Sequence, residues 1–389
     1  MMRTLVTFGA LLAATSAATL DAPKVDVEAL DGTRSALDLD GLELDSLGPE
    51  RALLRFPAGA APRTPDGTLE LRLRAGDRVL GRPLGGGEER LELELVGGMA
   101  VGFALEDVDV LFADADRERL AGLAPAEGAD RLWRRAAGGY DKLDGFLLGF
   151  AAEGVEFEGE LGVSLVPWPE LAALYVVELE PFEAGDSTGQ VAVDLVDGSR
   201  LRGAFAGLSE GILHLDRGGD APLELAVGHL LQLALEDPRQ VFLGALPFEE
   251  LGPGGLFGDG FGLPWPPRVD EAVGGGSLRV GGTVHARGLG VHAPSRLAFD
   301  LEPGGLLRGA VGIDDSVLDL PAEGSVVFRL HWNGAAVWES ATLSSGDAPV
   351  GLPALDLSAG GRLELEADPT DDSIPGDRAN WLDLRVVRP

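Results

Sequence analysis

Short runs in which apolar and polar residues alternate recur between residues 25 and 250 of the chain. Three of them share one order: an alternating stretch, a turn built from Asp and Gly, an Arg, and a second alternating stretch. They read VDVEALDGTRSALDLDGLEL from Val25, LELRLRAGDRVLGRPLGG from Leu69 and VAVDLVDGSRLRGAFAGLSEGILHL from Val191. Alternation with period two predicts half-buried strands, and Asp-Gly between two such strands predicts a hairpin. We therefore expect repeated small β units.

A fourth, degenerate copy is expected from Asp141, with Asp144 and Gly145 in its turn. Two of the other units close with a further alternating stretch, GFALEDVDVLFA from Gly102 and LELAVGHLLQLALE from Leu223. Units of several short, twisted strands resemble the Sm-like and SH3-like small barrels. The resemblance rests on the strand pattern alone and implies spacer or interaction modules.

A helical interlude is expected between the copies, over residues 114–138. The apolar spacing of DADRERLAGLAPAEGADRLWRRA, from Asp114 to Ala136, suits one or two short helices. Its basic end could be a binding patch, or a helix end with solvated charges. The residues concerned are Arg131, Trp133, Arg134 and Arg135.

From Ser277 to Val387 the pattern is again strand after strand. SVVFRLHWNGAAVWES is expected to form a hairpin about Asn333 and Gly334, since Asn-Gly favours a type I′ turn. About eight short strands in roughly 110 residues predict a β-sandwich, in the form of a jelly roll. The stretch before it is rich in Gly, Pro and aromatic residues, and Trp265 between two prolines is expected either to pack on the neighbouring domain or to form a platform for a sugar.

These patterns divide the chain into five segments and define an all-β protein with one helical insertion. We expect a signal peptide at 1–18, a small β-barrel unit at 19–113, the helical interlude at 114–138, a second small-barrel region at 139–245, and a lead-in with the sandwich at 246–389. The first segment has Arg3 before a short apolar run and small residues near Ala17, which is the order of a secretory signal. The mature chain is expected to be secreted, periplasmic or at the cell surface, without a transmembrane segment.

Composition narrows the function further. The 389 residues carry a formal net charge of −33 and no cysteine, so thiol chemistry and cysteine metal sites are excluded. Such an acidic chain offers no basic surface for a phosphate backbone, and we expect no nucleic-acid partner.

The order of motifs in the sandwich region is similar to one family. GTVHARGLGVHAPSRLAFDL, GAVGIDDS, GSVVFRLHWNGAAVWES and DRANWLDLRV follow one another over roughly residues 240–389. This succession resembles the NPCBM family of carbohydrate-binding modules. The resemblance implies a galactose-binding-like sandwich, glycan recognition without catalysis and, in some members, structural calcium. HWNG in the hairpin departs from the family pattern, which leaves the ligand open.

Five side chains near the expected loop ends are candidates for carbohydrate binding, because sugars need planar hydrogen-bonding groups and an aromatic face. They are His285, Arg287, His292, Arg378 and Trp381. For His292 a buried structural role is the alternative, and for Trp381 the alternative is core packing.

The candidate calcium ligands are Asp314, Asp315 and Asp383, since calcium takes carboxylate oxygens. Asp314 and Asp315 lie together at a strand end, and Asp383 is added by analogy with related sandwiches. Solvated turn acids are the alternative interpretation of the first two.

No catalytic motif of a hydrolase or metalloprotease occurs, and no paired carboxylates lie in a recognisable glycosidase motif. The sequence thus predicts a secreted, non-catalytic protein that binds neutral, galactose-type glycans, with glycoconjugates and other envelope proteins as partners. The alternative is a structural or protein-interaction component of a bacterial cell envelope that binds no sugar.

Overall fold

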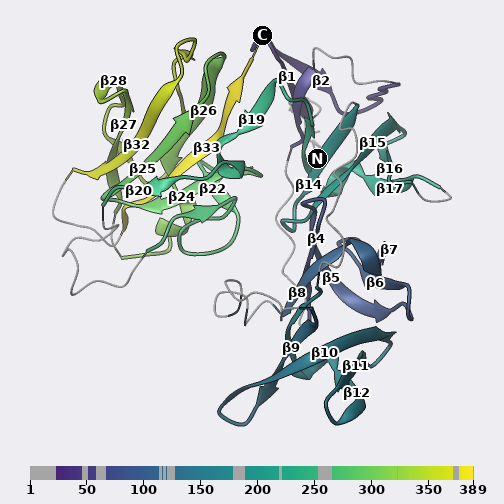
Figure 1. The fold of residues 1–389 in the computed structure, drawn as a ribbon. Coiled ribbons are helices and arrows are strands. Elements are labelled where there is room, and N and C mark those ends of the chain that lie inside the picture. Colours follow the sequence, from purple (N-terminus) through teal and green to yellow (C-terminus); the bar gives the residue numbers. More distant parts are fainter. Residues whose placement is uncertain are drawn as a thin grey trace, which may run out of the picture.

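The structure is a computed structural model that describes residues 23–45, 51–57, 67–113, 116, 120, 128–177, 189–218, 221–252, 265–321, 323–370 and 376–388. Antiparallel strands and short 3-10 turns dominate these residues, which confirms the all-β prediction (Figure 1). The expected signal peptide lies outside the described residues.

A five-stranded unit with one connectivity occurs three times, and we number it as units 2, 3 and 4. In each, the first strand pairs with the second and the fifth, and a 3-10 turn precedes the fifth. Unit 2 consists of β4 (Leu69–Leu73), β5 (Arg78–Gly85), β6 (Arg90–Glu94), β7 (Ala100–Ala104), η1 (Leu105–Asp107) and β8 (Val108–Ala113). The alternation read from the sequence is visible in β7, where Val101 and Phe103 are buried between exposed neighbours.

Units 3 and 4 repeat this plan. Unit 3 consists of β9 (Asp130–Ala136), β10 (Gly139–Ala151), β11 (Gly154–Gly159), β12 (Gly162–Pro167), η3 (Trp168–Glu170) and β13 (Leu171–Tyr175). Unit 4 consists of β14 (Gln190–Leu195), β15 (Arg200–Ser209), β16 (Ile212–Asp216), β17 (Leu223–Ala226), η4 (Val227–His229) and β18 (Leu230–Leu235). Every second strand shifts register at the same place, just before Gly85, Gly149 or Gly207. Such a bulge bends the strand and increases its twist.

Unit 1 is a reduced copy. Its strands are β1 (Lys24–Ala29), β2 (Arg34–Asp38) and β3 (Arg51–Arg55), and β1 pairs with both others. The hairpins predicted from Val25, Leu69 and Val191 are thereby confirmed, whereas the resemblance to Sm-like and SH3-like barrels stays a prediction.

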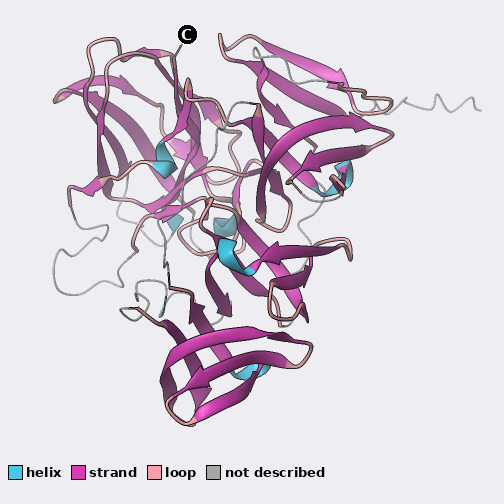
Figure 2. Ribbon diagram, turned by 45° about the vertical axis from the view of Figure 1, so that its right-hand side comes forward, coloured by secondary structure: helices cyan, strands magenta, loops and turns pink. Residues whose placement is uncertain are grey.

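The fifth strands join the units in pairs. Strand β8 of unit 2 lies antiparallel to β13 of unit 3, and β3 of unit 1 lies antiparallel to β18 of unit 4. One hydrophobic core cluster runs through all four units, from Val25 to Leu235. Unit 3 forms the end of the molecule that lies away from the sandwich (Figures 1 and 2).

Two expectations about unit 3 are wrong. The C-terminal part of the expected helix is strand β9, whose Arg131 and Arg134 pair across to Asp144 and Asp141 of β10. Cross-strand ion pairs and the burial of Leu132 favour the sheet over the helix. Most of the remaining interlude lies outside the described residues. Strand β10 also runs straight through the expected turn at Asp144, because the true turn comes earlier, at Gly138 with φ +96°.

The C-terminal region is a sandwich of two sheets. The first sheet has the order β21 (Arg268–Val269), β24 (Gly288–His292), β33 (Arg378–Val387), β26 (Leu306–Ile313) and β30 (Val350–Gly351), with β19 (Gln240–Phe242) beside β33 and β31 (Leu355–Asp356) beside β26. The second has the order β20 (Glu249–Glu250), β25 (Ser295–Leu301), β32 (Gly361–Pro369), β27 (Ser325–Trp332) and β28 (Ala335–Glu339), with β29 (Leu343–Ser344) beside β27. A separate hairpin joins β22 (Leu278–Val280) to β23 (Thr283–His285). The predicted Asn-Gly hairpin is confirmed: Asn333 and Gly334 both have positive φ, as a type I′ turn requires.

The glycines of GLGVHA let other backbone segments approach β24. A Cβ on Gly288 would lie 2.2 Å from the carbonyl oxygen of Trp381, and one on Gly290 would lie 2.2 Å from that of Glu271. The motif is therefore first of all a strand packed between close neighbours, and this packing fixes the residues at both of its ends.

Candidate functional site

The five predicted sugar-binding residues lie at three different places on the pair formed by β24 and β33. His292 and Arg378 are cross-strand partners at one end of the pair. Arg287 and His285 lie at the other end, where the sandwich meets the four units. Trp381 lies between them in the core, so the structure does not bring the five together.

The first end holds a group that we call the aromatic cluster: Trp265, His292 and Arg378. The indole of Trp265 stacks on the imidazole of His292 with ring centroids 5.1 Å apart and 23° between the planes. The guanidinium carbon of Arg378 lies 5.6 Å from the Trp265 ring centroid. Nη1 of Arg378 donates to Ser316 Oγ at 3.0 Å. An aromatic ring, a guanidinium and an imidazole thus meet at one end of the sheet.

His292 is buried, at 3% exposure, and neutral at neutral pH. Burial lowers its pKa, and the nearby charge of Arg378 acts in the same direction, although the hydrogen bond to Ala293 opposes both. Nδ1 lies 2.8 Å from the carbonyl oxygen of Ala293, so Nδ1 carries the proton and donates it. Nε2 is therefore the acceptor of this ring, and Trp265 covers the ring's face.

Trp381 belongs to the core rather than to a ligand surface. Its side chain is 0% exposed and makes an edge-to-face contact with Phe328 of the second sheet, at 5.2 Å between centroids. No face of this indole is open to a sugar in the structure. The alternative of core packing is the one that the structure shows.

The other end of β24 and β33 faces the four units, and we call this contact the junction. Asp383 has φ +48°, a left-handed conformation that an aspartate adopts more readily than most residues. Its carboxylate accepts from Arg55 Nε at 3.1 Å and lies 3.2 Å from His285 Nδ1. Burial raises the pKa of Asp383, but Arg55 and His285 outweigh burial and hold the pKa well below its usual range.

A second ion pair beside it is buried completely. Arg385 of β33 donates to Glu28 of β1, and both side chains are 1% exposed. Burial lowers the pKa of Arg385 to about 10, although Glu28 opposes the change. Glu28 also lies 3.3 Å from Arg55. Removing either partner of such a pair leaves a buried charge without compensation.

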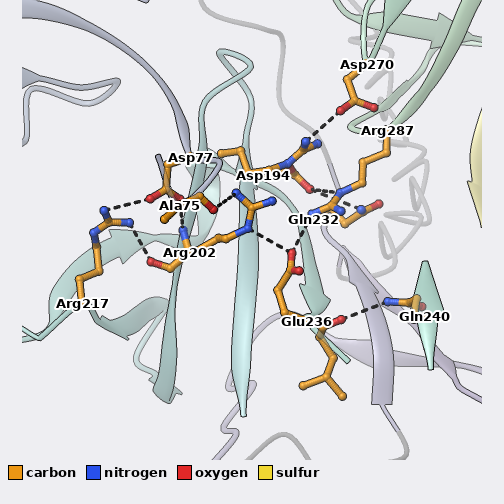
Figure 3. Close-up of polar contacts among 12 residues, drawn as sticks. Ala75, Asp77, Asp194, Arg202, Arg217, Gln232, Glu236, Gln240, Asp270 and Arg287 are labelled. Atoms are coloured by element: carbon orange, nitrogen blue, oxygen red, sulfur yellow. Dashed lines mark hydrogen bonds and ion pairs between the residues drawn. The ribbon is translucent and has the colours of Figure 1, made fainter. Parts of the chain in front are cut away.

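Asp194 of unit 4 organises the third part of the junction (Figure 3). It accepts from Arg287 Nε at 3.1 Å and from Arg200 Nε at 2.6 Å, and Gln232 donates to it at 3.4 Å. The other side of Arg200 donates to Asp270 at 2.9 Å. Arg287 thus binds a carboxylate of unit 4, and its guanidinium carbon lies 4.2 Å from the ring centroid of Phe242.

Charged residues of the junction occupy corresponding positions in the repeated units. Glu28 and Asp194 are the cross-strand partners of Arg34 and Arg200, the Arg that follows each Asp-Gly turn. In unit 2 the equivalent pair is Arg72 and Arg78, and both bind the buried Glu70. The hairpin of each of these units therefore carries a charged pair or triad that faces the sandwich. The recurring Arg was visible in the sequence, but its acidic partner on the neighbouring strand was not recognised there.

Two cavities flank the junction. One has a volume of about 510 Å³ and is lined by groups of both signs, among them Arg78, Arg200, Asp270 and Glu271. The other has about 290 Å³ and is lined by Arg55, Asp383 and His285 among others. Nε2 of His285 and Oδ1 of Asp383 are buried and have no hydrogen-bond partner among the described residues.

The predicted calcium ligands do not form a cage. Asp314 accepts from the backbone N–H groups of Ser316 and Arg279 and from Asn380, and Asp315 accepts from those of Gly281 and Gly282. These are donor sets that suit a carboxylate without a cation, and Asp383 is engaged at the junction. Among the residues that the structure describes, no group of three or more His, Asp or Glu is arranged to hold a metal. The three carboxylates are thus not gathered around one point in the structure, and calcium binding stays a prediction.

Comparison with known proteins identifies the sandwich. Residues 248–387 match the family model of the NPCBM/NEW2 domain, the family that the motifs of the sandwich resemble. The predicted resemblance is confirmed for these residues. The described residues contain no helix long and apolar enough to cross a membrane.

One curated relative and two solved structures are similar to parts of this chain. α-1,3-Galactosidase B of Akkermansia muciniphila is 34% identical over 121 residues, which are 30% of this chain and 15% of that protein. The chain therefore spans only a small part of this relative. A structure of CBM51-2 with GlcNAc and INT domains from Clostridium perfringens ZmpB is 21% identical with a TM-score of 0.34, covering 46% of this chain and 36% of that one. CBM51 from C. perfringens GH95 with methyl-galactose is 19% identical with a TM-score of 0.32, and the match covers 38% of this chain and 99% of that one.

Proposed function

We propose that this is an exported, non-catalytic protein whose sandwich binds neutral, galactose-type glycans through the aromatic cluster. The four β units hold the sandwich in a fixed position through the junction. The assignment of residues 248–387 to a family of carbohydrate-binding modules supports the class of function.

The observation that carries the proposal is the meeting of Trp265, His292 and Arg378. An aromatic ring can cover the C–H face of a pyranose, while a guanidinium donates two hydrogen bonds to neighbouring hydroxyl groups. Nε2 of His292 can accept a third hydrogen bond from a hydroxyl. These three groups together offer a sugar an aromatic face, two hydrogen-bond donors and one hydrogen-bond acceptor.

The choice of a neutral glycan follows from charge. A chain with a net charge of −33 repels anionic sugars at long range. The relative from A. muciniphila is an α-1,3-galactosidase, which supports a galactose-type ligand. We expect micromolar to millimolar affinity, on the order of −4 to −8 kcal/mol.

The test is a broad glycan array probed with the whole mature chain, followed by titration calorimetry with the best glycan and with methyl galactoside. Arg378→Ala should weaken binding by about 1–3 kcal/mol, because two hydroxyl groups lose their donor. Arg296→Ala is the matched control, since this arginine pairs with Glu364 on the second sheet. Equal binding by folded Arg378→Ala protein would place the site elsewhere.

The second candidate is a structural component of the cell envelope that binds no sugar. The stacking of Trp265 on His292 favours it, because this ring already packs against the protein on one face. A parent chain that binds no glycan on the array would support this candidate and overturn the first.

A further inference from the structure

The edge of unit 3 carries an apolar surface that neither the sandwich nor the other units cover. We call it the β12 face: Phe146 of β10 with Leu161, Val163 and Leu165 on and beside β12. Their exposed fractions are 52%, 104%, 64% and 47%. Strand β12 pairs with β11 alone among the described residues, so its outer backbone groups lack a partner strand.

The other units show that this surface is not required by the fold. In unit 2 the residue that corresponds to Leu165 is Gly102, and the guanidinium of Arg90 lies over it, where a Cβ would come within 2.1 Å. In unit 4 the corresponding residue is Glu224, which is exposed. A covering arginine or a charge on the edge strand is a usual protection against pairing with another chain. Unit 3 lacks both.

The same contrast holds one row further along the sheet. Phe146 pairs with Glu158, which pairs with Val163. In unit 2 this row holds an ion pair, Arg82 with Glu94 at 2.6 Å. Unit 3 keeps the acid and replaces the arginine by an exposed phenylalanine, which leaves Glu158 without a cation.

Charge indicates what the β12 face accepts. Glu156, Glu158 and Glu160 are exposed beside the apolar residues, and none has a cation within ion-pair distance among the described residues. A second copy of this chain would bring another acidic surface with a net charge of −33 to the same place. A segment with basic residues fits instead.

We propose that β12 binds an extended segment of a partner protein whose side chains on one face are apolar and basic in turn. The segment adds a strand to the sheet, so that its backbone pairs with the outer edge of β12. Glu156 and Glu158 are the cross-strand partners of Leu165 and Val163, so they lie on the same face as the apolar residues. The apolar side chains on that face of the segment then lie on Phe146, Val163 and Leu165, and the basic side chains on the same face extend toward the glutamates. The binding surface lies at the end of the molecule remote from the sandwich (Figure 1).

The test uses the full chain and a fluorescent nine-residue peptide whose odd positions are valine and lysine in turn and whose even positions are threonine, followed by fluorescence anisotropy. Wild-type protein should bind this peptide, and peptides with glutamate in place of lysine or with N-methyl groups on alternate residues should not bind. Leu165→Glu should weaken binding at least tenfold. This substitution adds a negative charge, so a peptide held by charge alone would bind it more tightly than wild type.

Glu224→Gln on the edge strand of unit 4 is the matched control and should leave the affinity unchanged. Val163→Glu gives a second variant, and a thermal melt of each shows whether it is folded. Failure of the lysine peptide to bind wild type, or unchanged binding by folded Leu165→Glu, overturns the proposal. Sedimentation that shows a wild-type dimer lost in Leu165→Glu would assign the β12 face to a second copy instead.

Discussion

The two ends of the strand pair β24 and β33 carry similar side chains in different surroundings. At the junction, Arg287 and Asp383 are each bound by a group of opposite charge across the boundary to the units, and His285 Nδ1 lies 3.2 Å from the carboxylate of Asp383. At the other end, no carboxylate of the described residues pairs with Arg378 or His292, and an indole lies against them instead. The same types of side chain therefore hold two parts of the molecule together at one end and contact an aromatic ring at the other. Residue type alone did not separate the two roles.

The largest effect is expected from breaking the buried pair of the junction. Glu28→Gln should destabilise the protein by about 3–5 kcal/mol, because Arg385 keeps its charge at 1% exposure without its carboxylate. Urea unfolding measures the change. The double variant Glu28→Gln with Arg385→Met should regain most of the loss, and a double variant as unstable as the single one would contradict this account.

Acid should weaken the junction through Asp383. Its lowered pKa stabilises the folded state fully above the unfolded value of about 3.9, and this contribution is lost as the pH falls from there through the folded pKa. Unfolding free energies at neutral pH and at about pH 3 should show a smaller acid-induced loss for Asp383→Asn than for wild type. Equal losses in the two proteins would show that other carboxylates dominate.

The pH should act on the aromatic cluster differently, through ligand binding. Because the pKa of His292 is lowered from 6.5, its Nε2 stays an acceptor at neutral pH and is protonated only as the pH falls through the lowered pKa. Glycan affinity should therefore be constant down to about pH 6.5 and fall as the pH drops through the lowered pKa. His292→Gln keeps an acceptor that does not titrate, and calorimetry should find its affinity independent of pH over this range. A wild-type profile that is equally flat would remove His292 from the site.

The smallest effect is expected from an ion pair outside both regions. Arg82 and Glu94 of unit 2 are 55% and 33% exposed, so solvent screens their attraction. Arg82→Ala should change the unfolding free energy by less than about 1 kcal/mol. A loss as large as that of Glu28→Gln would show that burial does not explain the difference between the junction and the surface.

Much of this architecture could be predicted from the sequence, because alternation and turns are local signals. The hairpins from Val25, Leu69 and Val191 and the Asn333–Gly334 turn were predicted correctly. Strand β9 was missed, since the arginines that suggest a helix end are matched by acids on a strand that comes later in the chain. For the site, the sequence indicated His292 and Arg378, with Trp265 as an open alternative.

The surroundings of Arg287 and Trp381 could not be predicted from the sequence, for a physical reason. Whether Arg287 meets a sugar or Asp194 depends on a contact between residues that are 93 positions apart, and no local pattern records such a contact. In the sequence, the position of Trp381 in its strand would also suit a surface residue. In the structure, Phe328 of the second sheet packs against it. Long-range packing decides both cases.

The pairing of Glu28 with Arg385 has a consequence for the order in which the chain can fold. The two residues are 357 positions apart, and β3 of unit 1 likewise pairs with β18 of unit 4, which is synthesised much later. Contacts of such long range make folding slow, because the entropy of closing the loop is lost before the contact forms. Units 2 and 3 can complete their hairpins as they emerge from the ribosome, whereas Glu28 of β1 acquires its buried partner only after β33 has been synthesised. The N-terminal unit is therefore among the last parts of the molecule to reach its native state.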